Sequence, residues 1–196
     1  MSVAPGRRGA SLRQALWQPQ ARALHAPPAL RDWLTTAGSL TAKLTAHSHA
    51  FRVQRLHQRT ARCLADEAAA LGLPRRDQVW EREVLLRCDN TAAVFAHTVV
   101  PLSATASDWP LFGALGERSL GTTLFGDPLV RRSVLEFARL REGHPLAQRA
   151  RAALGAEAAQ PDILYARRCL YRRRHGTLLV TEVFLPSVME LKQINI

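Results

Sequence analysis

The sequence predicts an α+β fold in which a twisted antiparallel sheet carries its helices in the connections between strands. Two segments, 79–100 and 163–185, each contain two largely apolar runs around a short polar turn, the pattern of a β-hairpin. Five or so strands linked in this way predict an antiparallel sheet covered on one side. At 196 residues and 47% hydrophobic content, the chain is long enough for one domain with a substantial core.

The N-terminal part predicts a tail followed by two short helices. Residues 1–28 contain no acid and several arginines, and they end on the helix-breaking run Ala26-Pro27-Pro28. Such composition also occurs in cleavable presequences, but without a long amphipathic face we expect a loosely ordered tail with one short helix. Residues 29–47 then predict two helices joined at Gly38, with Ser39 as the N-cap of the second.

The middle of the chain predicts a strand and a helix before the first hairpin. Residues 51–58 alternate in polarity as a strand does, and 60–72 predict a helix that Gly72 ends. The first hairpin then turns at Asp89-Asn90-Thr91.

The second half predicts two more helices and the second hairpin. Asp127-Pro128 is a typical helix start, and it predicts a helix over 128–141. Residues 143–161 predict a polar, exposed helical insertion. The second hairpin turns at His175-Gly176, so the predicted domain covers 29–187 and leaves 188–196 as a C-terminal tail.

The composition narrows the classes of partner. The formal charge is +11, and all basic residues except Lys43 and Lys192 are arginine. This charge favours an anionic partner, but no recognition-helix spacing, aromatic-interleaved basic stripe or zinc-finger pattern supports nucleic-acid binding. Steering of an anionic substrate needs only the net charge. Three widely spaced cysteines indicate a reducing compartment, without disulfides or a cysteine-ligated zinc site. No apolar run is long enough for a transmembrane helix.

One acid and one base stand alone on apolar strand faces. In the segment 178–186, Glu182 shares a face with Leu178, Val180 and Phe184. In 80–86, the base Arg82 shares a face with Trp80, Val84 and Leu86, which are all apolar. A buried carboxylate costs several kcal/mol unless it is paired or protonated. The pattern predicts a closed pocket for a small molecule that is partly anionic and partly apolar. A buried Arg82–Glu182 ion pair fits the same pattern, as does a strand that turns its charged face to solvent.

Five segments resemble, in order and spacing, the chorismate pyruvate-lyase family of ubiquinone biosynthesis. They are Asp32-Trp33-Leu34, Arg82-Glu83-Val84-Leu85-Leu86, His97-Thr98-Val99-Val100-Pro101, Ser119-Leu120-Gly121 with Leu124-Phe125, and Leu179-Val180-Thr181-Glu182-Val183-Phe184-Leu185-Pro186. The resemblance covers about residues 29–187. It implies a single α+β domain that cleaves chorismate to 4-hydroxybenzoate and pyruvate without metal or organic cofactor. It also implies a cytoplasmic monomer that retains its aromatic product in an enclosed site.

The resemblance assigns roles to four residues. It implies that Arg82 grips a carboxylate and that Glu182 contacts the ring hydroxyl as an acid or base, while Leu40 and Leu120 contribute backbone groups and apolar walls. Without the resemblance, either leucine would be an ordinary core residue.

The sequence departs from the family pattern in three places. Leu40 replaces a familiar methionine, a change that conserves volume. His97 replaces a familiar arginine, which predicts the loss of a positive charge from the approach to the pocket. The third departure is the long insertion 143–161.

Two rival functions follow from other features. A non-catalytic effector-binding module of related fold would keep the pocket and lose the acid, and Glu182 together with the absence of a helix-turn-helix segment counts against it. A nucleic-acid-binding protein would account for the charge.

Overall fold

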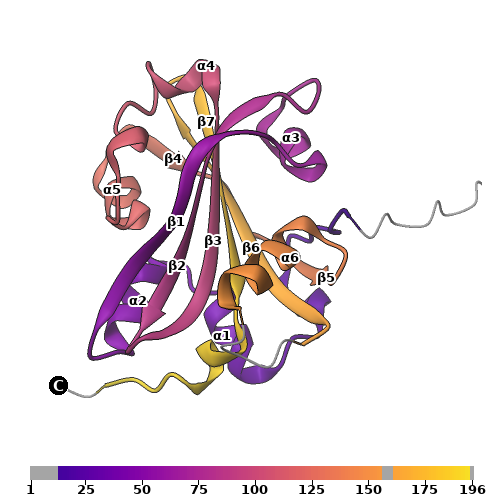
Figure 1. The fold of residues 1–196 in the computed structure, drawn as a ribbon, viewed down its shortest axis with the longest axis vertical. Coiled ribbons are helices and arrows are strands. Elements are labelled where there is room, and N and C mark those ends of the chain that lie inside the picture. The colour runs from indigo at the N-terminus through magenta and orange to yellow at the C-terminus, as the bar shows by residue number, and fades with distance from the viewer. Residues whose placement is uncertain (1–12, 156–160, 195–196) are drawn as a thin grey trace, which may run out of the picture.

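A seven-stranded antiparallel sheet forms the centre of the structure, a computed structural model that describes residues 13–155 and 161–194 (Figure 1). The strands are β1 (Phe51–Arg62), β2 (Gln78–Cys88), β3 (Thr91–Pro101), β4 (Val130–Arg132), β5 (Glu136–Arg141), β6 (Ile163–Arg173) and β7 (Gly176–Phe184). They lie in the order β1-β2-β3-β7-β6-β4, and β5 pairs with the other end of the same edge of β6. The predicted α+β class and antiparallel sheet are confirmed.

Helices cover both faces of the sheet. The helices are α1 (Pro28–Leu34), α2 (Leu40–Ala46), α3 (Ala65–Leu71), α4 (Leu102–Thr105), α5 (Leu120–Gly126) and α6 (Pro145–Leu154), with short 3₁₀ turns η1 (Ala21–Leu24), η2 (Phe112–Ala114) and η3 (Pro186–Glu190). In Figure 1, α2 and α5 lie on one side of the sheet, and α3 and α6 lie on the other. The prediction of a sheet covered on one side was wrong, because β2 and β3 bury the side chains of both faces.

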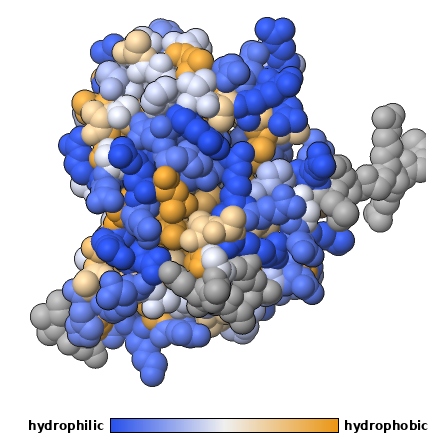
Figure 2. All heavy atoms as spheres, viewed as in Figure 1, coloured by the Kyte–Doolittle hydropathy of each residue, from blue (hydrophilic) through white to orange (hydrophobic). Residues whose placement is uncertain are grey.

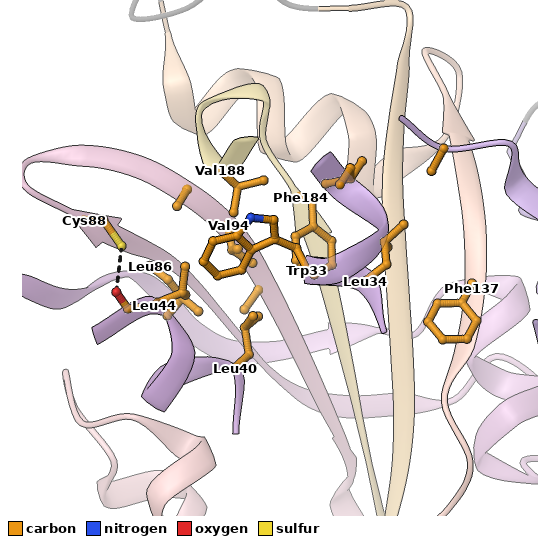
Figure 3. Close-up of a cluster of buried hydrophobic side chains, with 14 of the residues drawn as sticks. Trp33, Leu34, Leu40, Leu44, Leu86, Cys88, Val94, Phe137, Phe184 and Val188 are labelled. Carbon is orange, nitrogen blue, oxygen red and sulfur yellow. Dashed lines mark hydrogen bonds between the residues drawn. The ribbon is translucent and has the colours of Figure 1, made fainter. Parts of the chain in front are cut away.

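Each face of the sheet has its own apolar core. On one face, Trp33 and Leu34 of α1 and Leu44 of α2 pack against Leu86 and other strand residues (Figure 3). In the same cluster the Cys88 thiol donates a hydrogen bond to the carbonyl of Leu44, at 3.8 Å. The buried core of the other face joins the strands to α6, and it includes Leu85, Phe95, Val183, Leu146 and Ala150. Alternation along each strand divides the apolar residues between these cores.

The two hairpin turns fix the register of the central strands. Asp89 and Asn90 both have positive φ, at 47° and 69°, as expected of a two-residue turn that follows the twist of its strands. In the second hairpin Arg173 pairs with Gly176, so the turn consists of Arg174 and His175 and lies one residue earlier than predicted.

The predicted helix 128–141 is wrong, because this segment forms β4 and β5. Two of the residues expected on its apolar face, Leu129 and Val134, are largely exposed. Asp127 does accept a hydrogen bond from the amide of Leu129, at 2.9 Å, but its other oxygen binds Arg173 of β6. The free edge of β6 therefore decides the conformation, since pairing with it gives the backbone of this segment its partners.

The predicted helix 60–72 is shorter than expected. The first strand extends to Arg62, and α3 begins only at Ala65. The two helices around Gly38 are confirmed, and the side chain of Ser39 accepts a hydrogen bond from the amide of Ala42 as an N-cap.

Segments predicted to be loose or exposed pack in part against the domain. Within the predicted tail 1–28, Trp17 donates a hydrogen bond to Asp66, and Leu24 is buried; residues 1–12 lie outside the described part. In the predicted insertion 143–161, α6 is not an exposed helix, because one of its faces is buried in the core; residues 156–160 are not described. In the predicted tail 188–196, Val188 is buried, and 195–196 are not described.

None of the helices in residues 13–155 and 161–194 has the length and apolar character needed to cross a lipid bilayer.

Candidate functional site

A cavity lies between the sheet and the helices α2 and α5. The space within it, including the part that is open to solvent, amounts to about 640 Å³. Arg82, Glu182, Leu40 and Leu120, the four residues that the sequence assigned to a site, all line it. The structure therefore brings together side chains that are far apart in the sequence.

The register of the sheet explains why Arg82 and Glu182 face the same cavity. Arg82 on β2 pairs with Thr98 on β3, and Thr98 pairs with Val180 on β7. Glu182 follows two residues after Val180, so it points to the same face one step along the strand. The chain reversal at Asp89 sets the first of these pairings, whereas the second joins strands that are distant in sequence.

Arg82 is buried and held by the loop that precedes α5. Its side chain is 2% exposed, and Nη2 donates hydrogen bonds to the carbonyls of Gly116 and Arg118, each at 3.0 Å. Its Nε is buried without a hydrogen-bond partner among the described residues. Burial, followed by the nearby charge of Arg55, lowers the pKa of Arg82 to about 10, so the guanidinium is charged at neutral pH. An unpaired donor on a fixed cation suits an anionic ligand.

Glu182 pairs with Arg167 and not with Arg82. The Oε2 of Glu182 lies 2.5 Å from the Nε of Arg167 on the neighbouring strand β6. Through Nη1, Arg167 also donates to the carbonyls of Leu34 and Thr36, at 3.2 and 2.8 Å, where α1 ends. The alternative of an Arg82–Glu182 ion pair is therefore wrong for this structure. The Oε1 of Glu182 has no hydrogen-bond partner in residues 13–155 and 161–194, which leaves it available to a ligand.

Leu40 and Leu120 occupy equivalent places at the cavity. Each is the first residue of a seven-residue helix, α2 or α5, and each follows a serine N-cap. The two helix starts are joined by a hydrogen bond of 2.7 Å between the hydroxyls of Thr41 and Ser119. The first N–H groups of a helix lack acceptors within the helix, so the backbone here has donors to offer beside apolar side chains.

The cavity contains two arginines and a tyrosine that the sequence did not predict as site residues: Arg132, Arg167 and Tyr171. Arg132 belongs to β4, which was predicted as helix. Arg167 was missed because no partner across the hairpin was sought for Glu182, and the predicted turn would have set Cys169 opposite it. Placing the turn at Arg174-His175 would have predicted that Arg167 lies opposite Glu182. Burial raises the pKa of Tyr171, and Cys169 and Glu182 reinforce the shift, so its hydroxyl stays protonated.

His97 does not lie at the approach to the cavity, contrary to prediction. It precedes Thr98 on β3 and therefore points to the opposite face. There it is fully buried between Glu67 and Glu83, with ion-pair distances of 2.9 and 3.0 Å. Burial alone would lower the pKa of His97, but these two carboxylates outweigh it and raise the pKa to about 10. The replacement therefore keeps a positive charge, in the core behind the cavity wall.

One group in the described part of the chain brings together atoms of the kinds that bind metals. His57, Glu81 and Glu83 offer three such atoms within 4.8 Å of one another. The Nη1 of Arg149, however, contacts both carboxylates, at 3.0 and 2.7 Å. This cluster lies on the face away from the cavity, and Arg149, Arg59 and His97 already pair with its carboxylates.

The charges that line the cavity suit a small anion. Among the described residues these are three guanidinium groups and one carboxylate, from Arg82, Arg132, Arg167 and Glu182. Apolar walls around them lower the local dielectric constant, which strengthens charge-assisted hydrogen bonds.

Comparison with known proteins identifies close sequence relatives. A family model for chorismate lyase matches residues 11–194. A "Probable chorismate pyruvate-lyase" of Cupriavidus pinatubonensis is 51% identical over 83% of this chain and 84% of its own length. A protein of the same description from Cupriavidus metallidurans is 52% identical over 81% of this chain and 74% of its own length. Another, from Nitrosomonas eutropha, is 43% identical over 85% of this chain and 92% of its own length.

Solved structures share the fold at low sequence identity. The C-terminal domain of PhnF aligns with a TM-score of 0.52 and 18% identity, over 67% of this chain and 80% of that domain. A GntR-family transcriptional regulator from Bacillus cereus aligns with a TM-score of 0.52 and 12% identity, over 74% and 99%. These likenesses concern the fold alone.

Proposed function

Because this chain belongs to the chorismate lyase family, we propose that it cleaves chorismate to 4-hydroxybenzoate and pyruvate, the first committed step toward the ubiquinone ring. The observation that carries the proposal is that one cavity contains both a buried cation with an unpaired N–H and a carboxylate with an unpaired oxygen. Arg82 and Glu182 supply these two groups.

The substrate chemistry matches the two groups. Chorismate carries a carboxylate on its ring and a hydroxyl at the opposite ring carbon. Arg82 grips the ring carboxylate through charged hydrogen bonds, with Nε among its donors. Glu182 accepts a hydrogen bond from the ring hydroxyl or takes the proton of the hydroxyl-bearing carbon, and Arg167 holds its carboxylate in place. Aromatisation of the ring drives the reaction, so orientation and one proton are the enzyme's main tasks.

Leu40 and Leu120 complete the binding site in this proposal. Their side chains form part of the apolar wall for the ring, and the N–H groups at the two helix starts face a ligand that carries negative charge. The hydroxyl contact between Thr41 and Ser119 keeps the two helix starts together.

An effector-binding module remains the rival class, since transcriptional regulators share the fold. A module that only binds an aromatic acid needs the cation and the apolar walls. It does not need an acid held by a second arginine, as Glu182 is. This pair favours the lyase.

The protein is further proposed to work as a cytoplasmic monomer without metal or organic cofactor. Cys63, Cys88 and Cys169 are unpaired and buried, which fits a reducing compartment. The edge strand β1 exposes four arginines, and charged side chains on an edge discourage pairing with a second sheet. They are Arg52, Arg55, Arg59 and Arg62. The face of the molecule in Figure 2 is mostly hydrophilic.

The test is turnover of chorismate by the purified protein in the presence of a metal chelator, with 4-hydroxybenzoate and pyruvate measured separately. We expect equal amounts of both products. The Arg82→Ala variant should lose about 2 kcal/mol or more of transition-state stabilisation, roughly 30-fold in kcat/KM. The exposed Arg52→Ala is the matched control. Binding of 4-hydroxybenzoate without any turnover of chorismate would instead identify an effector-binding module.

A further inference from the structure

The cavity contains more positive charge than one carboxylate requires. Three arginines and one glutamate among the described lining residues give it a net charge of +2. Chorismate, the substrate in the proposed function on which this inference rests, has two carboxylates, one on the ring and one on the enolpyruvyl ether. Since the proposed function assigns only the first to Arg82, the second needs a cation of its own.

Besides Arg82, Arg132 is the lining arginine that forms no ion pair with a carboxylate of the described residues. The charge of Arg167 is matched by direct contact with Glu182, and its Nη1 is engaged by carbonyls at the end of α1. The Nε of Arg132 donates to the Cys169 thiol at 3.4 Å, and its Nη1 donates to the carbonyl of Ala37. Its Nη2 has no hydrogen-bond partner in the described ranges. A half-buried guanidinium with a terminal nitrogen free can bind a carboxylate.

The strand order places Arg132 on the correct side of Glu182. Arg82 is on β2, Glu182 on β7 and Arg132 on β4, in a sheet that runs β2-β3-β7-β6-β4. Arg132 pairs with Tyr171 on β6, and its side chain reaches along β6 to Cys169, toward the end where β6 meets Glu182, so its guanidinium approaches Glu182 from the side opposite to Arg82. In chorismate the ether oxygen is on the carbon next to the hydroxyl-bearing one. With the ring carboxylate at Arg82 and the hydroxyl at Glu182, the enolpyruvyl group leaves the ring beside the hydroxyl, where Arg132 can meet its carboxylate.

We propose that Arg132 binds the carboxylate of the enolpyruvyl group and thereby holds the leaving group of the reaction. The bond between the ring carbon and the ether oxygen breaks, and its electron pair leaves with the enolpyruvate. The proton on the hydroxyl-bearing carbon departs, and its electron pair completes the aromatic ring. The enolpyruvate gains that proton and becomes pyruvate, so the atoms balance. A cation on the leaving group counters the negative charge that develops there.

A purely structural role for Arg132 makes a different prediction. Arg132 also contacts Ala37 before α2 and lies 5.7 Å from the centre of the Phe125 ring in α5. If it only joined these covering elements, its loss would weaken every ligand of the cavity. Chorismate and 4-hydroxybenzoate separate the two roles, because only chorismate carries the enolpyruvyl carboxylate.

The experiment measures kcat and KM for chorismate and the dissociation constant for 4-hydroxybenzoate in Arg132→Gln. We expect kcat/KM to fall at least about tenfold, while the dissociation constant changes less than about threefold. Arg131→Gln, which alters the exposed neighbour on the same strand, should change neither. Parallel loss of both ligands in Arg132→Gln, or unchanged kcat/KM, would overturn the proposal.

Arg132→Lys keeps the test decisive if the glutamine variant does not fold. The lysine keeps the charge but loses the planar fork, so we expect a smaller fall in kcat/KM with the same sparing of 4-hydroxybenzoate. Unchanged kcat/KM in this folded variant, or equal weakening of both ligands, contradicts the role of Arg132. If the unmodified protein does not turn over chorismate at all, the proposed function is wrong, which is a separate outcome.

Discussion

At Glu182, one carboxylate oxygen is held and the other is open to a ligand. Arg167 fixes Oε2 at 2.5 Å, and it is itself fixed by carbonyls at the end of α1. The residue that would handle the proton in the proposed reaction is thus oriented by a neighbour that is nearly fully buried. Such a supporting contact keeps a functional side chain in one rotamer.

Glu182→Gln should separate chemistry from binding. Glutamine keeps the shape and much of the hydrogen bonding but cannot take up a proton, so kcat should fall by about 10² or more. The affinity for 4-hydroxybenzoate should stay within a few-fold of the unmodified protein. Steady-state kinetics and calorimetric titration measure the two quantities, and Glu190→Gln provides an exposed control. Normal turnover in Glu182→Gln would mean that the proton leaves by another route.

At the scale of elements, the hairpin turns have more influence than the helices on which strand residues lie opposite one another. The β6–β7 turn sets Arg167 opposite Glu182, and a shift of one residue would pair Glu182 with a different strand residue. Gly176 closes this turn against the loop after α4. A Cβ at this position would lie 2.5 Å from the Cβ of Asp108 and 2.9 Å from that of Ala104.

Gly176→Ala should therefore destabilise the protein. The added methyl group must displace buried side chains, which typically costs about 1–3 kcal/mol. Gly113→Ala is the matched control, because a Cβ there has no heavy atom within 4 Å, and its effect should stay within about 0.5 kcal/mol. Urea unfolding measures both free energies. Equal stability of the two variants would show that the contact at Gly176 relaxes freely.

For the whole molecule, the two faces of the sheet separate two kinds of charge. One face lines the cavity with three arginines and one acid. The other buries His97, Glu67, Glu81 and Glu83 beneath α3 and α6, where Arg149 joins them. Buried charges of this kind are stable only while they remain paired. The overall stability should therefore depend on pH through this second face.

The contribution of Glu83 and His97 to the free energy of unfolding should be greatest between about pH 4.5 and 6.5. Burial raises the pKa of Glu83, but His97 and Arg149 outweigh it and lower the pKa to about 2, so this contribution is lost as pH falls from 4.5 toward 2. The pKa of His97 is raised from 6.5 to about 10, so its contribution is complete below 6.5 and is lost as pH rises toward 10.

Urea unfolding at a series of pH values checks both limits. The free energy of unfolding should fall above pH 6.5 with a slope of at most about 1.4 kcal/mol per pH unit from one proton. His97→Gln should lower stability and abolish this alkaline slope, whereas His175→Gln, at an exposed turn, should leave it in place. An alkaline slope that persists in His97→Gln would assign the dependence to other groups.

The sequence alone determined the antiparallel class, the presence of the two central hairpins and which strand residues share a face with Arg82 and with Glu182. These features follow from local rules, since side chains alternate along a strand and Asp89-Asn90 tolerates positive φ. The family resemblance then added Leu40 and Leu120, which both line the cavity.

Only the tertiary structure decided which charges meet. Arg132 lies in a segment with helix signals that becomes a strand because the edge of β6 offers hydrogen-bond partners. The contact of Arg167 with Glu182 depends on the register of a turn, and the raised pKa of His97 depends on Glu67 in α3, thirty residues earlier in the chain. Periodicity reports which face a residue occupies. It cannot report what another element brings to that face, because such pairing is decided by contacts that are distant in sequence.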